Sequence, residues 1–209
     1  MKNIKLLKGI HVLLLVLSIL LISTCSSDSK EEESLIPING LEEVEENALL
    51  FMLEEEKLAR DTYTFLSELW SLNQFENIKK SEQSHMNAVA SLLDKNNIDY
   101  TILPYGEFNN QELQNLYNQF KIDGAINKSK ALQIGATIED LDIVDLQSFM
   151  DNISNVSIES VFKSLQCGSR NHLRSFVKAI EMNGDTYTPQ YLTSDSYTAI
   201  LTGSQEKCN

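Results

Sequence analysis

A glutamate and a histidine three residues apart, Glu82 and His85, stand where the pattern of the chain predicts hydrophobic side chains. On a helix this spacing puts both side chains on one face, so they can reach a common point. Ile78, Val89 and Leu92 continue the same face at steps of three and four, which is the pattern of a buried helix. A carboxylate and an imidazole are costly to bury unless they are paired, hydrogen-bonded or bound to a cation. The pair therefore predicts a polar or metal-binding site inside the fold.

The helix predicted for residues 41–72 carries one carboxylate in its apolar stripe. Glu56 takes a place in a series of apolar residues at alternating steps of three and four. Glu54 and Glu55 lie off that stripe, so both are predicted to face solvent. Tyr63, seven residues after Glu56 on the stripe, is interpreted as a packing residue, with a hydrogen bond to a bound ligand as the alternative.

The helix predicted for residues 129–149, with its first residue as the N-cap, places two carboxylates on its apolar face. Glu139 and Asp142 lie one turn apart on that face. Asp140 and Asp145 fall outside the pattern and are predicted to lie off the buried face. This helix thus offers two acidic groups to the same interior.

A fourth helix, predicted for residues 158–182, repeats the anomaly with His172. Each polar residue by itself has a structural explanation, such as a core histidine bonded to a carboxylate. The whole set is harder to explain in that way, because several buried carboxylates beside two imidazoles repel one another without a cation. Carboxylate-rich sites with one histidine per ion suit iron or manganese, and two divalent ions can share a bridging glutamate. The candidate metal ligands are Glu56, Glu82, His85, Glu139, Asp142 and His172.

The elements that must position these residues are long helices. Long apolar periodicities, with only three prolines and eight glycines, favour an all-α domain over a sandwich or barrel. The helix that carries Glu82 is predicted for residues 77–96, and a long connection with a short amphipathic helix at residues 110–121 follows it. Such a crossover lets the third helix run parallel to the second, so the prediction is a four-helix bundle with a long crossover between helices 2 and 3.

The N-terminal segment reads as an export signal. In residues 1–24, three lysines precede an apolar run that is too short for a confident transmembrane helix. Residues 21–25 resemble a bacterial lipobox, in which Cys25 becomes the lipid-modified first residue, although Thr24 departs from the usual small residue before it. An ordinary secretory signal with a nearby cleavage site is the alternative.

Residues 25–40 are polar and acidic, and are predicted to form a disordered tether before the bundle at residues 41–200 and a C-terminal tail at residues 201–209. The acidic residues after Cys25 also resemble a tag that sends lipoproteins to the outer face of the outer membrane. The expected location is therefore the bacterial cell envelope, at the outer membrane, with a lipid anchor as the only membrane contact.

The charge balance excludes some partners. Removal of residues 1–24 leaves 14 basic and 30 acidic residues, a net charge of −16. Such a chain is a poor partner for nucleic acid or for an anionic membrane surface. Cys167 and Cys208 remain, and they form either a disulfide that ties the tail to the last helix or a buried small residue and a free thiol.

Four blocks of sequence carry a family resemblance. Glu56, Ala59, Arg60 and Tyr63 match the first-helix pattern Glu-x-x-Ala-Arg-x-x-Tyr of rubrerythrins, in the ferritin-like di-iron carboxylate superfamily. More closely, the chain is similar to an uncharacterised bacterial ferritin-like family, domain of unknown function 2202. That similarity covers nearly all of residues 42–200 and rests on residues 54–61, 81–86, 138–143 and 168–174.

The resemblance implies a ferritin-like bundle that binds iron, as a di-iron pair, or manganese, and that reacts with oxygen or peroxide as an oxidase, peroxidase or ferroxidase. No Cys-x-x-Cys module is present, so electrons for peroxide reduction are expected from an external donor. The chain departs from the superfamily at Ser169, where the fourth helix usually supplies a glutamate. The second ion is then held weakly, or takes Asp142 instead, and a single-ion site stays open. The alternative function is a non-catalytic surface lipoprotein with a structural or storage metal.

Overall fold

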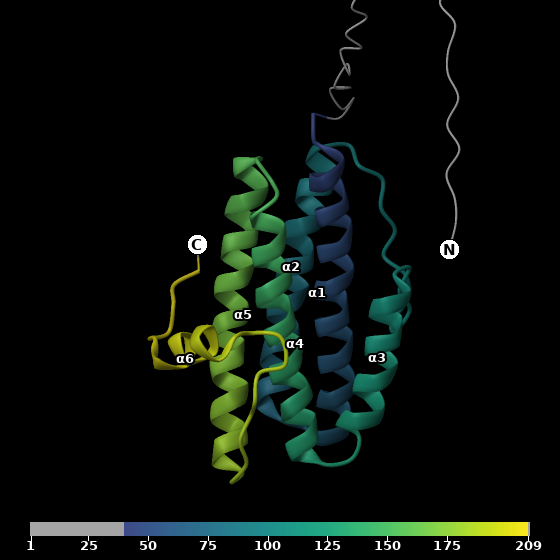
Figure 1. The fold of residues 1–209 in the computed structure, drawn as a ribbon. Coiled ribbons are helices and arrows are strands. Elements are labelled where there is room, and N and C mark those ends of the chain that lie inside the picture. The colour runs from purple at the N-terminus through teal and green to yellow at the C-terminus, as the bar shows by residue number, and fades with distance from the viewer. Residues whose placement is uncertain (1–39, 209) are drawn as a thin grey trace, which may run out of the picture. The chain divides into compact units, whose positions relative to one another are not determined.

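The computed structural model describes residues 40–208, which contain six helices and no strand (Figure 1). The predicted export signal, Cys25 and nearly all of the acidic tether lie outside these residues. Within residues 40–208 there is no helix with the length and hydropathy that crossing a membrane requires. The helices are α1 (Glu43–Trp70), α2 (Asn73–Lys95), α3 (Gln111–Gly124), α4 (Lys128–Met150), α5 (Val156–Met182) and α6 (Ser194–Thr202).

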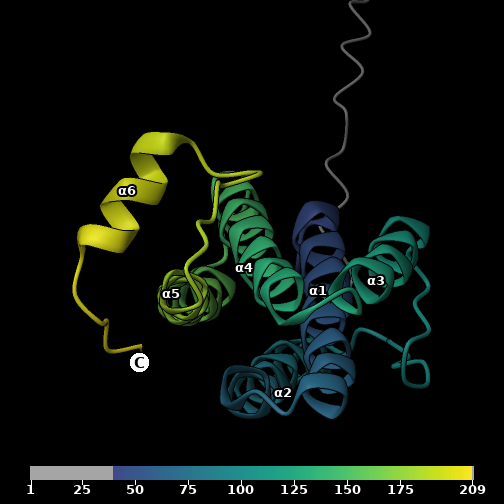
Figure 2. The ribbon, with the colours of Figure 1, turned by 90° about the horizontal axis from the view of Figure 1, so that it is seen from below.

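Four long helices, α1, α2, α4 and α5, form the body of the domain (Figure 2). α1 packs mainly on α2 and α4 mainly on α5, while further contacts join α1 to α4 and α2 to α5. The connection between α2 and α4 contains α3, which packs on α1 and α4. This connection returns the chain to the other end of the domain, so α2 and α4 run in the same direction, as predicted (Figure 1).

The helix boundaries differ from the prediction mainly at the N-termini. Asn127, not Ser129, is the N-cap of α4, because the Asn127 side chain accepts a hydrogen bond from the backbone N–H of Lys130. Ser129 lies inside the first turn and its hydroxyl donates to Asp185. The prediction also lacked α6, a helix of nine residues capped by Thr193.

Two hydrophobic clusters fill the interior at different levels along the helices. One cluster includes Leu58, Phe75 and Leu173. The other includes Met52, Met86 and Phe162. On each long helix the candidate ligands fall between residues of the two clusters. The domain therefore holds a polar layer between two apolar layers.

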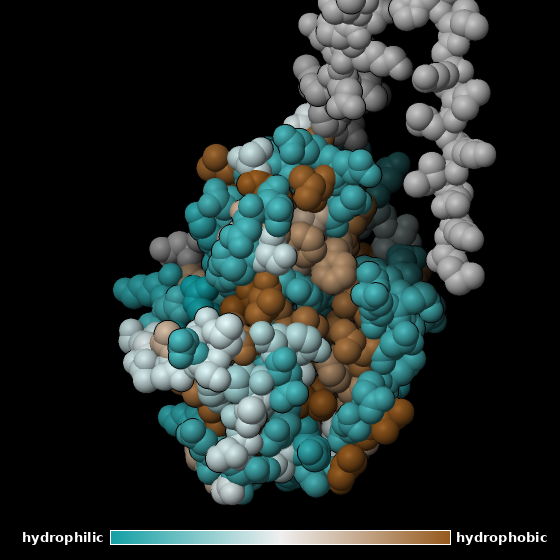
Figure 3. Space-filling view, viewed as in Figure 1, coloured by the Kyte–Doolittle hydropathy of each residue, from teal (hydrophilic) through white to brown (hydrophobic). Residues whose placement is uncertain are grey.

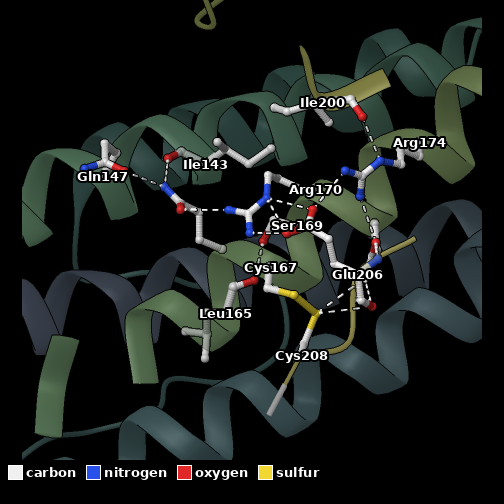
Figure 4. A network of polar contacts seen from close by, with 12 residues as sticks. Ile143, Gln147, Leu165, Cys167, Ser169, Arg170, Arg174, Ile200, Glu206 and Cys208 are labelled. Carbon is white, nitrogen blue, oxygen red and sulfur yellow. Dashed lines mark hydrogen bonds and ion pairs between the residues drawn. A yellow bond between two sulfur atoms is a disulfide. The ribbon is translucent and has the colours of Figure 1, made fainter. Parts of the chain in front are cut away.

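The surface over these layers is mostly hydrophilic on the face seen in Figure 3, with hydrophobic side chains showing in the hollow between α3 and the C-terminal segment. The C-terminal segment is tied to α5 by a disulfide between Cys167 and Cys208, which decides the question that the sequence left open. Glu206 lies between two arginines of α5 (Figure 4): it accepts from Arg170 and, at 2.8 Å, from Nη2 of Arg174. Covalent and ionic contacts together fix this segment along the helix.

Candidate metal centre

The first group of candidate ligands joins α1 and α2. Nδ1 of His85 lies 2.9 Å from Oε2 of Glu82 and 3.1 Å from Oε2 of Glu56. Both glutamates are 2% exposed, whereas the His85 side chain is 13% exposed. The regular helical phase explains this meeting, because Glu56 occupies a core position of α1 and Glu82 and His85 lie one turn apart on α2.

The second group joins α2, α4 and α5. Nδ1 of His172 lies 2.9 Å from Oε1 of Glu82 and 3.4 Å from Oε2 of Glu139. Glu82 therefore directs one oxygen to each histidine. The two imidazole rings lie nearly parallel, with centroids 5.7 Å apart. In each group of three residues the potential ligand atoms all lie within 4.8 Å of one another.

Several of these atoms have no hydrogen-bond partner within the part of the chain that the structure describes. Oε1 of Glu56, Oε1 of Glu82 and Nδ1 of His172 are all buried and unpartnered. The last two atoms are 2.9 Å apart, but their angles do not allow a hydrogen bond. Both atoms can therefore contact the same third atom. Buried oxygens and imidazole nitrogens left unpaired are a donor set that fits iron or manganese.

The pKa shifts in the centre follow from burial and from the mutual contacts of its charged groups. Burial raises the pKa of Glu56 to about 7, although His85 opposes the shift, and burial also raises the pKa of Glu139. Burial acts to lower the pKa of each imidazole, but the nearby carboxylates outweigh it and raise the pKa to about 12 for His85 and about 10 for His172. Burial opposes ionisation of Glu82, yet its two histidine neighbours lower its pKa. Without a cation the centre must therefore hold protons on its ligands.

The sixth predicted ligand stands beside the two groups. Asp142 is 5% exposed, and its Oδ2 accepts a hydrogen bond from the hydroxyl of Ser169, whose oxygen also lies 3.0 Å from the backbone carbonyl oxygen of Leu165. Burial raises the pKa of Asp142 well above its usual value. Its other oxygen, Oδ1, is buried without a partner. The structure thus brings five of the six predicted ligands together and places Asp142 next to them.

Two acidic residues that were predicted to lie off the buried faces are in fact buried. Glu55 is 1% exposed, because α1 has neighbouring helices on three sides, α2, α3 and α4, and one apolar stripe underestimates its buried face. Asp140 is fully buried because the segment before α6 covers it. Its Oδ2 accepts from the Tyr187 hydroxyl at 2.8 Å and its Oδ1 from the backbone N–H of Leu192 at 2.7 Å. Local periodicity cannot reveal either contact.

Two further residues contact the candidate ligands, and a third lies on the apolar face of α4. The Tyr63 hydroxyl is fully buried and donates to Oε1 of Glu139 at 2.6 Å, so this tyrosine both packs and contacts a candidate ligand. At Gly168 a Cβ atom would lie 2.8 Å from the His85 ring, so only glycine leaves room for that ring. At Gly135 a Cβ atom would lie 2.5 Å from Cε1 of Phe176, which explains the small residue on the apolar face of α4.

A surface pocket reaches the outer side of the centre. It measures about 470 Å³, lies between α2 and α5, and is lined by His172, Ser81 and, from the C-terminal segment, Gln205. The Ser81 hydroxyl lies 3.5 Å from Nε2 of His85. The disulfide and the Glu206 contacts hold Gln205 at the wall of this pocket. Sequence reasoning did not find this pocket, since its walls come from distant segments.

Comparisons with known proteins identify a matching family and a similar protein of known structure. Residues 45–204 match the family described as "Uncharacterized protein domain (DUF2202)". The chain is 42% identical over 176 residues to the uncharacterized protein MJ0754 of Methanocaldococcus jannaschii, a match that covers 83% of this chain and 95% of that protein. The crystal structure of hypothetical protein MJ0754 is similar with a TM-score of 0.76 and 43% identity, over 77% of this chain and 93% of that chain.

Proposed function

The chain belongs to the DUF2202 family, and from that premise we propose that it is a ferritin-like four-helix bundle that binds two iron or manganese ions in its interior. The observation that carries the proposal is the position of Glu82, with one carboxylate oxygen beside each of the two histidines. Glu56 and His85 complete one set of ligands, and Glu139 and His172 complete the other. A shared glutamate between two such sets suits a pair of divalent ions.

Bound iron or manganese supplies activation of oxygen or peroxide, the chemistry of an oxidase, peroxidase or ferroxidase. The chain itself holds the ligands in place and buries the carboxylates of Glu56, Glu82 and Glu139. Tyr63 fixes one oxygen of Glu139 and leaves the other facing His172. Gly168 lets the His85 ring approach α5 closely. These contacts keep both ligand sets in position before an ion arrives.

The pocket beside His172 supports access by a small oxidant from solvent. Reducing equivalents for peroxide would come from an external donor, because the chain has no Cys-x-x-Cys motif and Cys167 and Cys208 are joined to each other. The substrates that this proposal names are therefore metal ions, oxygen or peroxide, and an electron donor that docks from outside.

The disulfide also supports the proposed location. Disulfides persist in exported proteins and are rare in reducing compartments. Together with the signal-like residues 1–24, the pair Cys167 and Cys208 favours a lipoprotein of the bacterial cell envelope, anchored through Cys25 at the outer membrane. Lipid analysis of the mature N-terminus would test the anchor. An unmodified N-terminal residue would mean that the protein is secreted without a lipid anchor.

One observation favours a second function, a non-catalytic lipoprotein with a structural or storage metal. Ser169 stands where a second shared glutamate would complete the ligands, and its hydroxyl is already bonded to Asp142. The centre then has one shared carboxylate instead of two. A bound ion with fewer anionic ligands has a different reactivity. The second function therefore predicts a protein that binds metal but does not oxidise added ferrous iron.

Metal analysis of the purified mature protein, followed by oxidation of added ferrous iron with oxygen or peroxide, tests the proposal. We expect about two ions per chain and oxidation above the rate without protein. Replacement of His172 by alanine should remove at least one ion, whereas replacement of the exposed Lys163 on the same helix should not change the metal content. Bound metal that is inert to both oxidants would favour the second function, and folded protein that binds no metal would contradict both.

A further inference from the structure

The last described residues, 203–208, form a segment along α5 that buries almost no surface. Five of its six residues are exposed and Glu206 is partly buried, so the hydrophobic effect contributes little to its position. Polar and covalent contacts hold it instead. Glu206 lies between Arg170 and Arg174, and the disulfide follows two residues later (Figure 4).

This segment forms part of the wall of the pocket beside His172. Gln205 lines the pocket of about 470 Å³, and so does Asn171 of α5. The Asn171 side chain accepts from the backbone N–H of Glu206 at 3.0 Å and donates to its backbone carbonyl at 3.1 Å. The contacts that hold the segment on α5 are therefore also the contacts that keep Gln205 at the pocket.

The disulfide that secures the segment can be reached by a small molecule. Cys167 is 7% exposed, whereas Cys208 is exposed, and both line a second pocket of about 260 Å³. Lys163 and Lys207 line the same pocket; Lys163 shares its charge with Glu159, and Lys207 adds a second ammonium. A thiolate is the species that attacks a disulfide, and nearby positive charge stabilises thiolates. The pocket thus has the size and the charge to admit a small thiol.

We propose that Cys208 is a site of thiol–disulfide exchange, at which a small dithiol reduces the bond to Cys167 and releases the segment from the wall of the pocket beside His172. A thiolate of the dithiol attacks Sγ of Cys208, and the electron pair of the broken bond leaves on Sγ of Cys167. The second thiol then displaces Cys208, so the dithiol is oxidised to a cyclic disulfide and its two protons pass to the two cysteines. This inference goes beyond the proposed function and requires no bound metal.

The test is hydrogen–deuterium exchange of the mature protein with and without dithiothreitol, read by mass spectrometry. Alkylation counts the reduced cysteines, and circular dichroism confirms that the protein stays folded. The reporter is the backbone amide of Glu206, which donates to Asn171. Because a covalent tether raises the effective concentration of the contacts that it closes, we expect this amide to exchange roughly 100-fold faster after reduction. The core amides of α5 should not change.

Variants separate the bond from the charges beside it. Cys208→Ser should exchange as fast as the reduced protein, with or without dithiothreitol. Lys163→Gln/Lys207→Gln should slow the reduction by roughly tenfold, since it removes the charge that favours the thiolate. The matched control is Lys128→Gln/Lys130→Gln, which removes the same charge from exposed positions of α4 and should be reduced at the wild-type rate.

Three results would overturn the proposal. Complete reduction without faster exchange at Glu206 would mean that the ion pairs hold the segment by themselves. Reduction that occurs only when the protein unfolds, or at equal rates in both lysine variants, would remove the exchange site. A crystal structure of Cys208→Ser with Gln205 still at the pocket would do the same for the release. Wild-type protein with dithiothreitol decides the matter even if a variant fails to fold, and the proposed function is tested separately by its metal content.

Discussion

Two buried groups of charges lie one residue apart on α1 and are built in opposite ways. Around Lys57, which is 1% exposed, every charge has a partner. The ammonium donates to Oδ2 of Asp61 at 2.6 Å and to the backbone carbonyls of Pro104 and Glu107, each at 3.0 Å. Asp61 also accepts from the Arg60 side chain at 2.7 Å. This group binds the connection between α2 and α3 to α1.

Around Glu56, in contrast, acidic groups outnumber basic ones and several atoms are unpartnered. The two groups differ in whether their polar atoms have partners, and this difference decides how each buried charge is interpreted. A group whose hydrogen bonds are all made has no need of a ligand and serves the fold. A group with unpaired atoms that converge is stabilised only when something else binds. The cluster around Lys57 is therefore structural, and the cluster around Glu82 is the candidate site.

The largest effect on stability is expected from Asp61→Asn. It leaves the buried ammonium of Lys57 without its counterion, which costs about 3–5 kcal/mol of the free energy of unfolding. Urea unfolding should show this loss, while the metal content of the folded protein stays unchanged. Asp99→Asn, at an exposed position, is the control. A loss of metal in Asp61→Asn would show that the two groups are not separate.

The change Glu82→Gln should have the largest effect on metal binding. It removes the carboxylate that both ligand sets share, so both ions should bind at least roughly 100-fold more weakly. Titration of the metal-free protein with Mn²⁺ measures this. Asn87→Ala, an exposed change on the same helix, should bind as the wild type does. If one ion kept its affinity, Glu82 would belong to a single set of ligands.

The pH dependence of stability should differ between metal-free and metal-loaded protein. A group whose pKa is raised by folding stabilises the fold at a pH below its pKa in the unfolded chain. That stabilisation is lost as the pH rises through its pKa in the folded protein, which is about 7 for Glu56 and about 10 for His172. The lowered pKa of Glu82 acts only below its ordinary value of 4.5. The midpoint of thermal unfolding of metal-free protein should therefore fall by roughly 5 °C between about pH 5 and pH 8.

Bound Mn²⁺ should reverse that trend. The cation replaces the protons on the ligands, so its affinity rises with pH and stabilises the fold more at pH 8 than at pH 5. Thermal melts with chelator and with Mn²⁺, at matched ionic strength, give both curves. Parallel curves would mean that no proton leaves the centre on metal binding.

The smallest effect is expected from Ser169→Ala. Asp142 loses the hydroxyl that donates to it, at a cost of about 1 kcal/mol in the free energy of unfolding. Both ions should be retained, because Ser169 lies outside the two sets of ligands. Metal analysis and urea unfolding of the same preparation measure both quantities. Loss of one ion would instead make the hydroxyl a ligand.

The four long helices and five inward-facing candidate ligands could be predicted from the chain, and the reason is local. A helix fixes the angle between successive side chains, so a glutamate or histidine at a core position must point inward wherever the helix packs. Glu56, Glu82 and His172 were assigned in this way and are 2%, 2% and, for the histidine side chain, 13% exposed. The all-α fold follows from the same periodicity.

The rest was decided by tertiary structure. Periodicity shows one face of a helix, whereas burial depends on how many neighbours surround it, and so Glu55 and Lys57 were not recognised as buried. Asp140 is covered by residues about 50 positions away in the chain. Distances also follow from packing alone: that Glu82 divides its two oxygens between His85 and His172 depends on how α2 approaches α5. The chain determined which residues face inward, and the packing of the helices decided which of them share a site, because side-chain direction is local and proximity is not.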